Sequence, residues 1–403
     1  CVHTMSSLYQ HVEMAPNDPI LGLNEQFIVD SRTNKVNLSI GVYSDDNGHL
    51  PLLKAVRAAE QQHFEGASPR GYLPIQGLAS YNKAAQALPL GEDSPIIAQG
   101  RAVTVETIGG TGALKIGADF LKKLTPDSKV YVSNPSWQNH EAIFQDAGFT
   151  VEAYPYYSAD IHGLDFAAMK SHLEQVDARS IIVLHACCHN PTGIDPTLEQ
   201  WQEILDIVKA RDLIPFLDIA YQGFGAGLQE DAQVVRLFAE AGVEILVSSS
   251  FSKSFSLYGE RVGALTLTTE NHELAEKVLS QVRTVIRTSY SNPPTHGATI
   301  VAAVLNSPEL FSMWEDELSQ MRVRIQSMRE QLVEKIKAAG VEQDFSFILK
   351  QKGMFSFSGL TKEQVERLRK DFAIYAVGSG RICVAALNSK NIDYVAKSIA
   401  TVL

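Results

Sequence analysis

A single lysine stands out in residues 248–263, which read Ser-Ser-Ser-Phe-Ser-Lys-Ser-Phe-Ser-Leu-Tyr-Gly-Glu-Arg-Val-Gly. Lys253 follows an apolar run, residues 243–247, and its neighbours are hydroxyl, aromatic and glycine residues. An amine held among apolar side chains loses hydration, so its charged form is disfavoured and its pKa falls. These are the conditions for a nucleophilic lysine or one that forms a Schiff base.

Hydroxyls and a guanidinium surround this lysine along the chain. Ser250 and Ser252 lie just before it, and Arg261 and Gly263 follow it. Such groups suit a phosphate bound next to an imine. Taken alone, such a segment is more often a strand-to-loop connection with a solvated lysine. The interpretation therefore depends on a partner for a pyridine ring elsewhere in the chain.

The elements that would position these groups alternate along the sequence. Periodicity predicts strands at 102–108, 129–133, 149–154, 181–185, 213–218 and 243–247, with helices at 113–124, 137–147 and 201–210. Such alternation indicates βαβ units and a parallel sheet. Ligands bind such sheets at the carboxyl ends of the strands. Gly110, Asn190, Asp218 and Lys253 each follow a predicted strand end, so we expect them to meet in one crevice.

Residues 109–112, Gly-Gly-Thr-Gly, are predicted to form a glycine turn that opens the helix at 113–124. The turn resembles a phosphate cradle, because backbone N–H groups at a helix start favour an anion. A dinucleotide fingerprint fits poorly. Counted from Gly110, the third glycine is replaced by Lys115, and the strand at 129–133 does not end in an acid that could hold a ribose. A lone phosphate is the better fit.

Asp218 ends an apolar strand and, if buried, needs a cationic partner. A protonated pyridine nitrogen would satisfy the carboxylate and keep the ring an electron sink. A helix cap is the alternative role, although the residues that follow start a helix poorly. Tyr221 and Asn190 are candidate donors to a phenolate oxygen on the same ring, while Asn190-Pro-Thr-Gly also fits an ordinary turn.

Composition narrows the class of partner. The chain has 403 residues, is 45% hydrophobic and carries a formal net charge of -11. The negative charge argues against nucleic acid or an anionic membrane surface as a partner. Four cysteines without a spaced framework fit a reducing compartment, so a cytoplasmic location is expected. Cys187-Cys188-His189 has no second ligand pair at zinc-like spacing, so we expect packing and no metal.

Targeting signals are not expected. Residues 1–25 lack the apolar core of a secretory signal, and the uncharged run 288–308 is broken by Pro293-Pro294. Met5-Ser-Ser is a natural start, so residues 1–4 fit an appended remnant.

A long helix is predicted at 307–339 from apolar residues repeating every three or four positions. The segments beyond it suggest a smaller α+β unit that the N-terminal segment joins in space. We therefore expect an N-terminal arm at 1–15, a small domain from 16–48 and 316–403, and a large ligand-binding domain at 49–315.

Together these motifs resemble the class I aminotransferases, and most closely the bacterial aspartate and aromatic-amino-acid types. The resemblance rests on Ser-Phe-Ser-Lys253 with Arg261 downstream, on His189-Asn-Pro-Thr-Gly193, on Asp218-Ile-Ala-Tyr221 and on residues 109–112, and it runs from about residue 6 to the C-terminus. It implies an α/β protein of pyridoxal-phosphate fold type I. Such a protein has a three-layer αβα large domain with a mostly parallel sheet and a smaller α+β domain. It also implies a homodimer with shared active sites.

The resemblance assigns roles residue by residue. Lys253 would carry pyridoxal 5′-phosphate and move the substrate proton, while Asp218 pairs with the ring nitrogen and Tyr221 and Asn190 hold the ring oxygen. Trp137 would stack on the ring and His140 support Asp218. The phosphate would be held by Gly110, Thr111, Ser250, Ser252 and Arg261, with Tyr72 from the neighbouring subunit.

For the substrates, amino acids and 2-oxo acids, the resemblance assigns Arg381 to the α-carboxylate. It assigns Arg287, across the dimer, to the distal carboxylate of aspartate, glutamate or 2-oxoglutarate. Trp137, Asn190, Ser39, Ile40 and Gly41 would complete the substrate site. Ser39 stands where aspartate-type members usually have glycine. This favours an enzyme that transfers the amino group of aromatic amino acids, and also of aspartate, to 2-oxoglutarate by a ping-pong mechanism. An aspartate transaminase with minor aromatic activity is the alternative.

Overall fold

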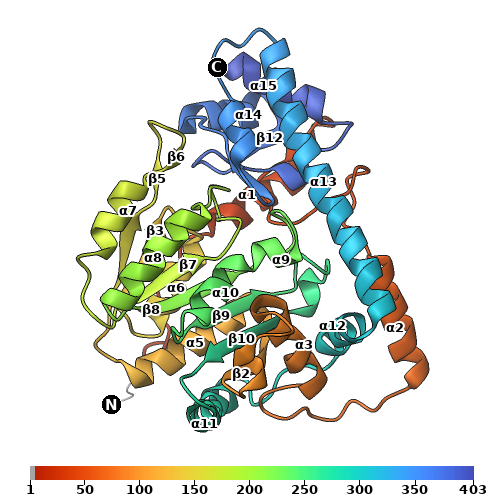
Figure 1. The fold of residues 1–403 in the computed structure, drawn as a ribbon. Helices are drawn as coiled ribbons and strands as arrows, with labels where there is room; N and C mark the ends of the chain where they lie inside the picture. The colour runs from red at the N-terminus through yellow and green to blue at the C-terminus, as the bar shows by residue number, and fades with distance from the viewer. Residues whose placement is uncertain (1–4) are drawn as a thin grey trace.

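A computed structural model describes residues 5–403, so the proposal that residues 1–4 are a remnant lies outside the described residues. Its centre is a seven-stranded sheet in the order β2-β10-β9-β8-β7-β3-β4, with helices on both faces (Figure 1). The strands are β2 (Ala102–Ile108), β3 (Val130–Asn134), β4 (Val151–Pro155), β7 (Ile181–His185), β8 (Ile214–Ile219), β9 (Leu246–Ser250) and β10 (Val262–Thr268). Every neighbouring pair is parallel except those made by β10, so the expected mostly parallel α/β fold is confirmed.

The remaining elements surround this sheet or form the upper part of Figure 1. The helices are α1 (Pro19–Val29), α2 (Lys54–Gly66), α3 (Ala79–Leu90), α4 (Pro95–Ala98), α5 (Gly109–Leu124), α6 (Gln138–Asp146), α7 (Phe166–Leu173), α8 (Leu198–Ala210), α9 (Leu228–Asp231), α10 (Gln233–Glu240), α11 (His272–Ser289), α12 (His296–Asn306), α13 (Pro308–Ala338), α14 (Lys362–Phe372) and α15 (Ile392–Val402). Short strands pair as β1 (Val36–Asn37) with β12 (Ile374–Tyr375), β11 (Phe355–Phe357) with β13 (Arg381–Cys383), and β5 (Tyr157–Ser158) with β6 (Gly163–Leu164). Three 3-10 turns complete the chain: η1 (Tyr258–Glu260), η2 (Ser346–Lys350) and η3 (Val384–Ala386).

Local sequence signals explain several helix starts. Thr197 and Gln200 form a reciprocal capping box at α8, and Thr361 with Gln364 does the same at α14. Ser307 caps α13, and Pro308 at its first turn has no N–H to leave unpaired. The predicted helix at 307–339 is therefore confirmed almost to the residue.

Three predicted boundaries were wrong. Strand β9 covers 246–250, not 243–247, because Ser248 and Ser250 are buried and take ladder positions opposite Asp218 and Gly263. Residues 35–43, whose sequence predicts one short strand, form a strand only at Val36–Asn37, where β12 offers a partner. Residues 109–112 are the first turn of α5 and not a separate turn: the helix begins at Gly109, whose φ of +68° lets the chain change direction after β2.

Close packing fixes α5 against the sheet. A Cβ on Gly117 would lie 2.5 Å from the Phe216 ring, and a Cβ on Gly263 would lie 2.3 Å from the backbone of Gly109. Only glycine allows these approaches. As a result, the N-terminus of α5 lies directly beside β10 and the end of β9.

The long helix α13 runs from the helices beside the sheet to the upper part of the molecule (Figure 1). Trp314 in its first half donates to the carbonyl of Ser254, next to Lys253. Arg324 further along donates to the carbonyls of Ala385 and Leu387 and to the hydroxyl of Tyr43. One unbroken helix thus contacts both parts of the molecule.

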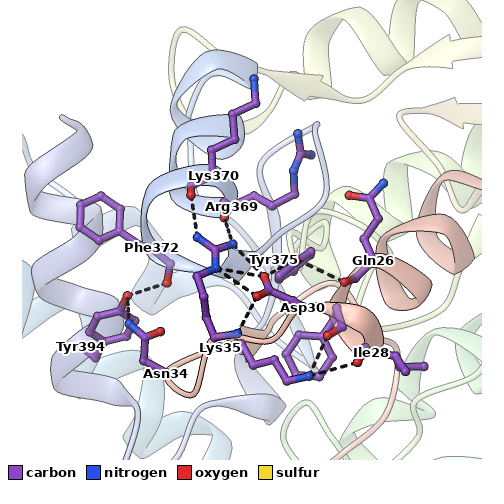
Figure 2. A network of polar contacts seen from close by, with 12 residues as sticks. Gln26, Ile28, Asp30, Asn34, Lys35, Arg369, Lys370, Phe372, Tyr375 and Tyr394 are labelled. Carbon is purple, nitrogen blue, oxygen red and sulfur yellow. Dashed lines mark hydrogen bonds and ion pairs between the residues drawn. The ribbon is translucent and has the colours of Figure 1, made fainter.

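The segment after α1 is tied to the upper part by a polar network (Figure 2). Asp30 accepts from Tyr375 at 2.6 Å and pairs with Arg32 at 2.7 Å, and Arg32 in turn donates to the carbonyls of Arg369 and Lys370 at the end of α14. Lys35 donates to the carbonyls of Phe27 and Ile28. The C-terminal end of α1 is thereby held to β12 and α14.

Candidate active site

The carboxyl ends of the parallel strands open into a pocket of about 310 Å³. It brings together most of the residues expected there: Gly41, Gly110, Thr111, Trp137, His140, Asn190, Asp218, Tyr221, Ser250, Ser252, Lys253, Arg261 and Arg381. Residues distant in sequence therefore converge on one crevice, as ligand sites in open α/β sheets do.

Asp218, at the end of β8, is the buried acid of this pocket. His140 Nε2 lies 2.7 Å from its Oδ2, and Ser248 donates to its Oδ1 at 3.0 Å. Burial by itself would raise the pKa of Asp218, but the hydrogen bond to His140 and the nearby imidazoles outweigh it, and the pKa is lowered. Asp218 is therefore a carboxylate at neutral pH.

Behind Asp218 a chain of side chains continues through the protein. Ser136 Oγ lies 3.0 Å from both His140 Nδ1 and His185 Nε2. His189 lies between the hydroxyls of Ser133 and Thr192. Burial lowers the pKa of His189 to about 3 and also lowers that of His185, so both rings are neutral.

Lys253 lies in the loop between β9 and η1, with its Nζ 5.0 Å from the centroid of the Tyr221 ring. Within residues 5–403 this amine makes no hydrogen bond or ion pair. Burial lowers its pKa to about 8, and the positive charges of Arg261 and Arg381 act in the same direction, against the opposing effect of Asp218. With this pKa roughly a tenth of the amine is unprotonated at pH 7, and this is the form that acts as a nucleophile.

An anion cradle forms part of the pocket lining. The N-terminus of α5 presents Gly110 and Thr111 beside Ser250, Ser252 and Arg261, and Arg261 Nη1 lies 3.5 Å from Ser252 Oγ. A Cβ on Gly109 would meet the Arg261 guanidinium at 2.5 Å, and one on Gly110 would meet Ser250 at 3.0 Å. Glycines here keep the backbone N–H groups open to a phosphate.

Arg381, the first residue of β13, also lines the pocket and is only 4% exposed. It donates to the carbonyl of Ser39 at 2.8 Å and to Asn190 Oδ1 at 3.3 Å, and its guanidinium lies 4.1 Å above the Phe355 ring. Its Nε is buried without a partner among the described residues. An unsatisfied buried donor of this kind is expected where a ligand supplies the acceptor.

Four of the expected residues do not line the pocket of this chain. Tyr72 is 93% exposed, and Arg287 is exposed at the end of α11, where it donates to Ser291 Oγ at 2.6 Å. Ser39 is buried and touches Arg381 through its backbone carbonyl, and Ile40 is partly buried beside it.

Sequence reasoning missed several lining residues, among them Ile20, His185, Tyr258 and Phe355. The hydroxyl of Tyr258 accepts from the backbone N–H of Tyr43 at 2.9 Å and so links the loop after Lys253 to the segment that carries Gly41. Tyr258 could have been identified from the sequence as a pocket residue, because it lies between Lys253 and Arg261 in the chain. Phe355 lies in a strand, Phe-Ser-Phe, whose alternation could have marked it as one face of a pocket wall.

No metal is implied by this site. Elsewhere among residues 5–403, the side chains of Cys187, Cys188 and Asp231 approach one another within 4.8 Å. The Asp231 carboxylate, however, accepts from the backbone N–H groups of Gly223, Gly225 and Ala226. Burial also raises the pKa of the Cys188 thiol, so this group fits packing better than metal binding.

Comparison with known proteins agrees with the fold. The family model "Aminotransferase class I and II" matches residues 33–399. An aspartate aminotransferase of Pseudomonas aeruginosa is 58% identical over 98% of this chain and all of its own length. An aromatic-amino-acid aminotransferase of Escherichia coli is 50% identical over 98% of this chain and all of its own length.

Among solved structures, an aromatic-amino-acid aminotransferase from Burkholderia pseudomallei, covalently bound to pyridoxal phosphate, superposes with a TM-score of 0.98. It is 60% identical, and the match covers 99% of this chain and all of the other. The chain belongs to the class I and II aminotransferase family. It is a transaminase, and its cofactor is pyridoxal 5′-phosphate.

The residues present fit this cofactor. A carboxylate and a partly unprotonated lysine line the same pocket, and a glycine-lined helix N-terminus lies beside an arginine and two serines. No helix within residues 5–403 combines the length and apolar character needed to cross a membrane.

Proposed function

We propose that this protein transfers the amino group of aromatic amino acids, and also of aspartate, to 2-oxoglutarate. The observation that carries the proposal is the lining of the pocket in one chain. Lys253 and Arg261 would face the cofactor, which leaves Arg381 as the cationic lining residue for a substrate carboxylate. The walls contributed by Ile20, Trp137 and Phe355 are apolar or aromatic and suit an aromatic side chain.

The cofactor would be held at three places. Gly110, Thr111, Ser250, Ser252 and Arg261 would hold its phosphate, Asp218 its ring nitrogen, and Tyr221 and Asn190 its ring oxygen. Trp137 would lie against the ring, and His140 would orient Asp218 through the 2.7 Å contact. When bound, the cofactor supplies an aldehyde that exchanges amino groups and a ring that accepts electron density.

The remaining chemistry belongs to the chain. Lys253 would carry the cofactor until an amino acid displaces it, and its amine would then remove the proton from the substrate Cα. Its lowered pKa, about 8, leaves the amine able to accept that proton near neutral pH. Arg381 would bind the α-carboxylate with two parallel N–H donors and so fix the Cα beside Lys253.

Dicarboxylate substrates need a second cation, and we propose that a second copy of the chain supplies it. Tyr72 and Arg287 are exposed in one chain, which is compatible with both reaching the pocket of the neighbouring subunit of a homodimer. Burying a Phe-sized side chain is worth about 1.5–3 kcal/mol, and losing one partner of a buried charge pair costs about 2–5 kcal/mol. Comparable magnitudes allow one pocket to serve both substrates. A cytoplasmic location accompanies this proposal.

A substrate panel tests the proposal. The purified holoenzyme is assayed with tyrosine, phenylalanine, tryptophan and aspartate, each against 2-oxoglutarate. We expect kcat/KM values for the aromatic substrates that equal or exceed the value for aspartate. A kcat/KM for aspartate that exceeds all three by more than about tenfold, or 1.4 kcal/mol, would identify an aspartate transaminase with minor aromatic activity.

A further inference from the structure

The long helix α13 buries a charged side chain that the site described above does not include. Arg329 is 1% exposed, and within residues 5–403 no carboxylate lies within ion-pair distance of it. Burial lowers its pKa to about 10, yet it remains a cation at neutral pH. A buried charge without a counter-ion is costly unless its hydrogen bonds are satisfied. The residues that accept hydrogen bonds from Arg329 therefore indicate which part of the structure this buried cation stabilises.

Arg329 makes all of its hydrogen bonds to one short segment. Its Nη2 donates to the carbonyl of Gly353 at 2.6 Å and to that of Phe355 at 2.8 Å, and its Nε donates to Ser356 Oγ at 3.0 Å. These acceptors span the start of β11. A planar guanidinium with donors in a rigid fork fixes their relative positions in a way that a single ammonium cannot.

The same segment is packed tightly on its other side. Gly353 adopts φ +93°, and a Cβ there would lie 2.7 Å from Cys188. The carbonyl of Gly193 accepts from the N–H of Lys352 at 2.7 Å, so the segment also contacts the loop that carries Asn190. Residues 353–356 are therefore held by Arg329, by this loop and by the pairing of β11 with β13.

Residue 355 is where the segment meets the pocket. The Phe355 ring lies under the guanidinium of Arg381 at 4.1 Å, and β11 pairs with β13, which begins at Arg381. A shift of this backbone would move both the ring and the strand that carries the arginine. Because a bidentate arginine–carboxylate pair depends on its geometry, such a shift would weaken the binding of a substrate carboxylate.

We propose that Arg329 is a positioning residue for Arg381, the proposed binding group of the substrate α-carboxylate. By fixing residues 353–356, Arg329 holds the Phe355 ring and, through it, the plane of the Arg381 guanidinium. The inference rests on the proposed role of Arg381. Arg329 does not line the pocket and acts only through Phe355 and Arg381. Its effect is therefore on substrate binding and not on proton transfer.

The test compares Arg329→Lys and Arg329→Met with Arg211→Met as a matched control. Arg211 likewise donates twice to a backbone carbonyl, that of Val176, but lies outside the pocket. In holoenzymes with the parent cofactor spectrum, we expect both Arg329 variants to raise KM for amino acid and 2-oxo acid by about tenfold, with kcat changed by less than about threefold. Arg211→Met should leave both constants unchanged.

A lysine variant with parent KM values would overturn the inference, because the ammonium keeps the charge and loses only the fork. Equal losses of kcat in both Arg329 variants with unchanged KM would also overturn it. If Arg329→Met does not fold, Ser356→Ala removes one of the three bonds and should raise KM by a smaller factor. An unchanged KM in that variant as well as in Arg329→Lys would count against the proposal.

Coupling provides the second readout. If Arg329 acts through Phe355, the double variant Arg329→Lys/Phe355→Leu should raise KM no further than Phe355→Leu does alone, whereas multiplied effects would show independent action. The variant Arg381→Leu distinguishes the proposed role of Arg381 in binding carboxylates from the proposed role of Arg329 in positioning Arg381. If it leaves KM for both substrates unchanged, the role of Arg381 fails; if it raises KM and the Arg329 variants do not, only the present inference fails.

Discussion

His140 Nε2 lies 2.7 Å from Asp218 Oδ2, and both side chains are buried. The bond keeps Asp218 ionised in an environment whose low polarity would otherwise favour the neutral acid. Removing either partner should therefore affect the same property, namely the negative charge available to the cofactor ring.

For Asp218→Asn we expect a folded protein with kcat/KM lowered by roughly 10²–10³-fold, the typical cost of losing one preorganised electrostatic group. His140→Asn should cost less, because Ser248 still donates to Asp218. Steady-state kinetics with phenylalanine and 2-oxoglutarate measure both. A larger loss in His140→Asn than in Asp218→Asn would contradict this order.

The lowered pKa of Lys253 predicts how its reactivity depends on pH. Burial favours the neutral amine, so in the cofactor-free protein half of Lys253 should react with an amine-selective reagent at about pH 8. Lys129, whose pKa is raised by its hydrogen bond to Glu152, is the internal reference and should react only at higher pH. Peptide mapping of the label across a pH series gives both midpoints. Coinciding midpoints would refute the lowered pKa.

Borohydride reduction of the holoenzyme should attach the cofactor to Lys253 and to no other lysine. Lys253→Ala should still bind the cofactor through the phosphate and ring contacts, with turnover lost. Mass spectrometry of the reduced, digested protein locates the label. A label on another residue would remove Lys253 from its proposed role.

Arg287 can be tested for action across the dimer. Arg287→Leu should lower kcat/KM for aspartate far more than kcat/KM for phenylalanine, because each value reports the half-reaction of that amino acid and, of the two donors, only aspartate brings a second carboxylate. Mixed dimers of Arg287→Leu chains with Lys253→Ala chains should regain aspartate activity, since one of their two sites combines an intact lysine with an intact arginine from the other chain. No recovery in mixed dimers would mean that Arg287 acts within its own subunit or not at all.

Glu106 gives a prediction for stability. This carboxyl is 2% exposed on β2, accepts from the N–H of Leu78, and has its pKa raised by burial to about 7. Because the folded-state pKa lies above the unfolded value, the favourable contribution is complete below about pH 4.5 and is lost as the pH rises through about 7. Glu106→Gln should therefore stabilise the protein at pH 8, by up to about 2–3 kcal/mol, and give little gain at pH 5. Urea unfolding at the two pH values measures this, and an equal gain at both would be inconsistent with it.

Much of the site was predictable from sequence because its residues follow strand ends. Asn190, Asp218 and Lys253 come after buried apolar runs, and the geometry of a parallel sheet places such positions at one edge. Gly110 and Thr111 could be placed for the same reason, from a glycine-rich helix start. The proposed roles of Tyr72 and Arg287 and the division into two domains stay predictions.

Tertiary contacts decided what sequence reasoning could not. Tyr258 enters the pocket because its hydroxyl meets the backbone of Tyr43, 215 positions earlier, and no local pattern encodes that pairing. Phe355 lies under Arg381 only because β11 and β13 pair in one particular register. The misplaced start of β9 has the same origin, since Ser248 and Ser250 are polar by type but are buried in the sheet ladder.

The length of α13 has a mechanical consequence. At 1.5 Å per residue its 31 residues form a rod of about 45 Å. Arg324 and Arg329 lie on the half of α13 that is far from the central sheet. Their side chains donate hydrogen bonds to segments that precede and follow Arg381 in the sequence. A tilt of α13 about its end near the sheet would move both segments together as a rigid body. Their positions relative to each other would not change.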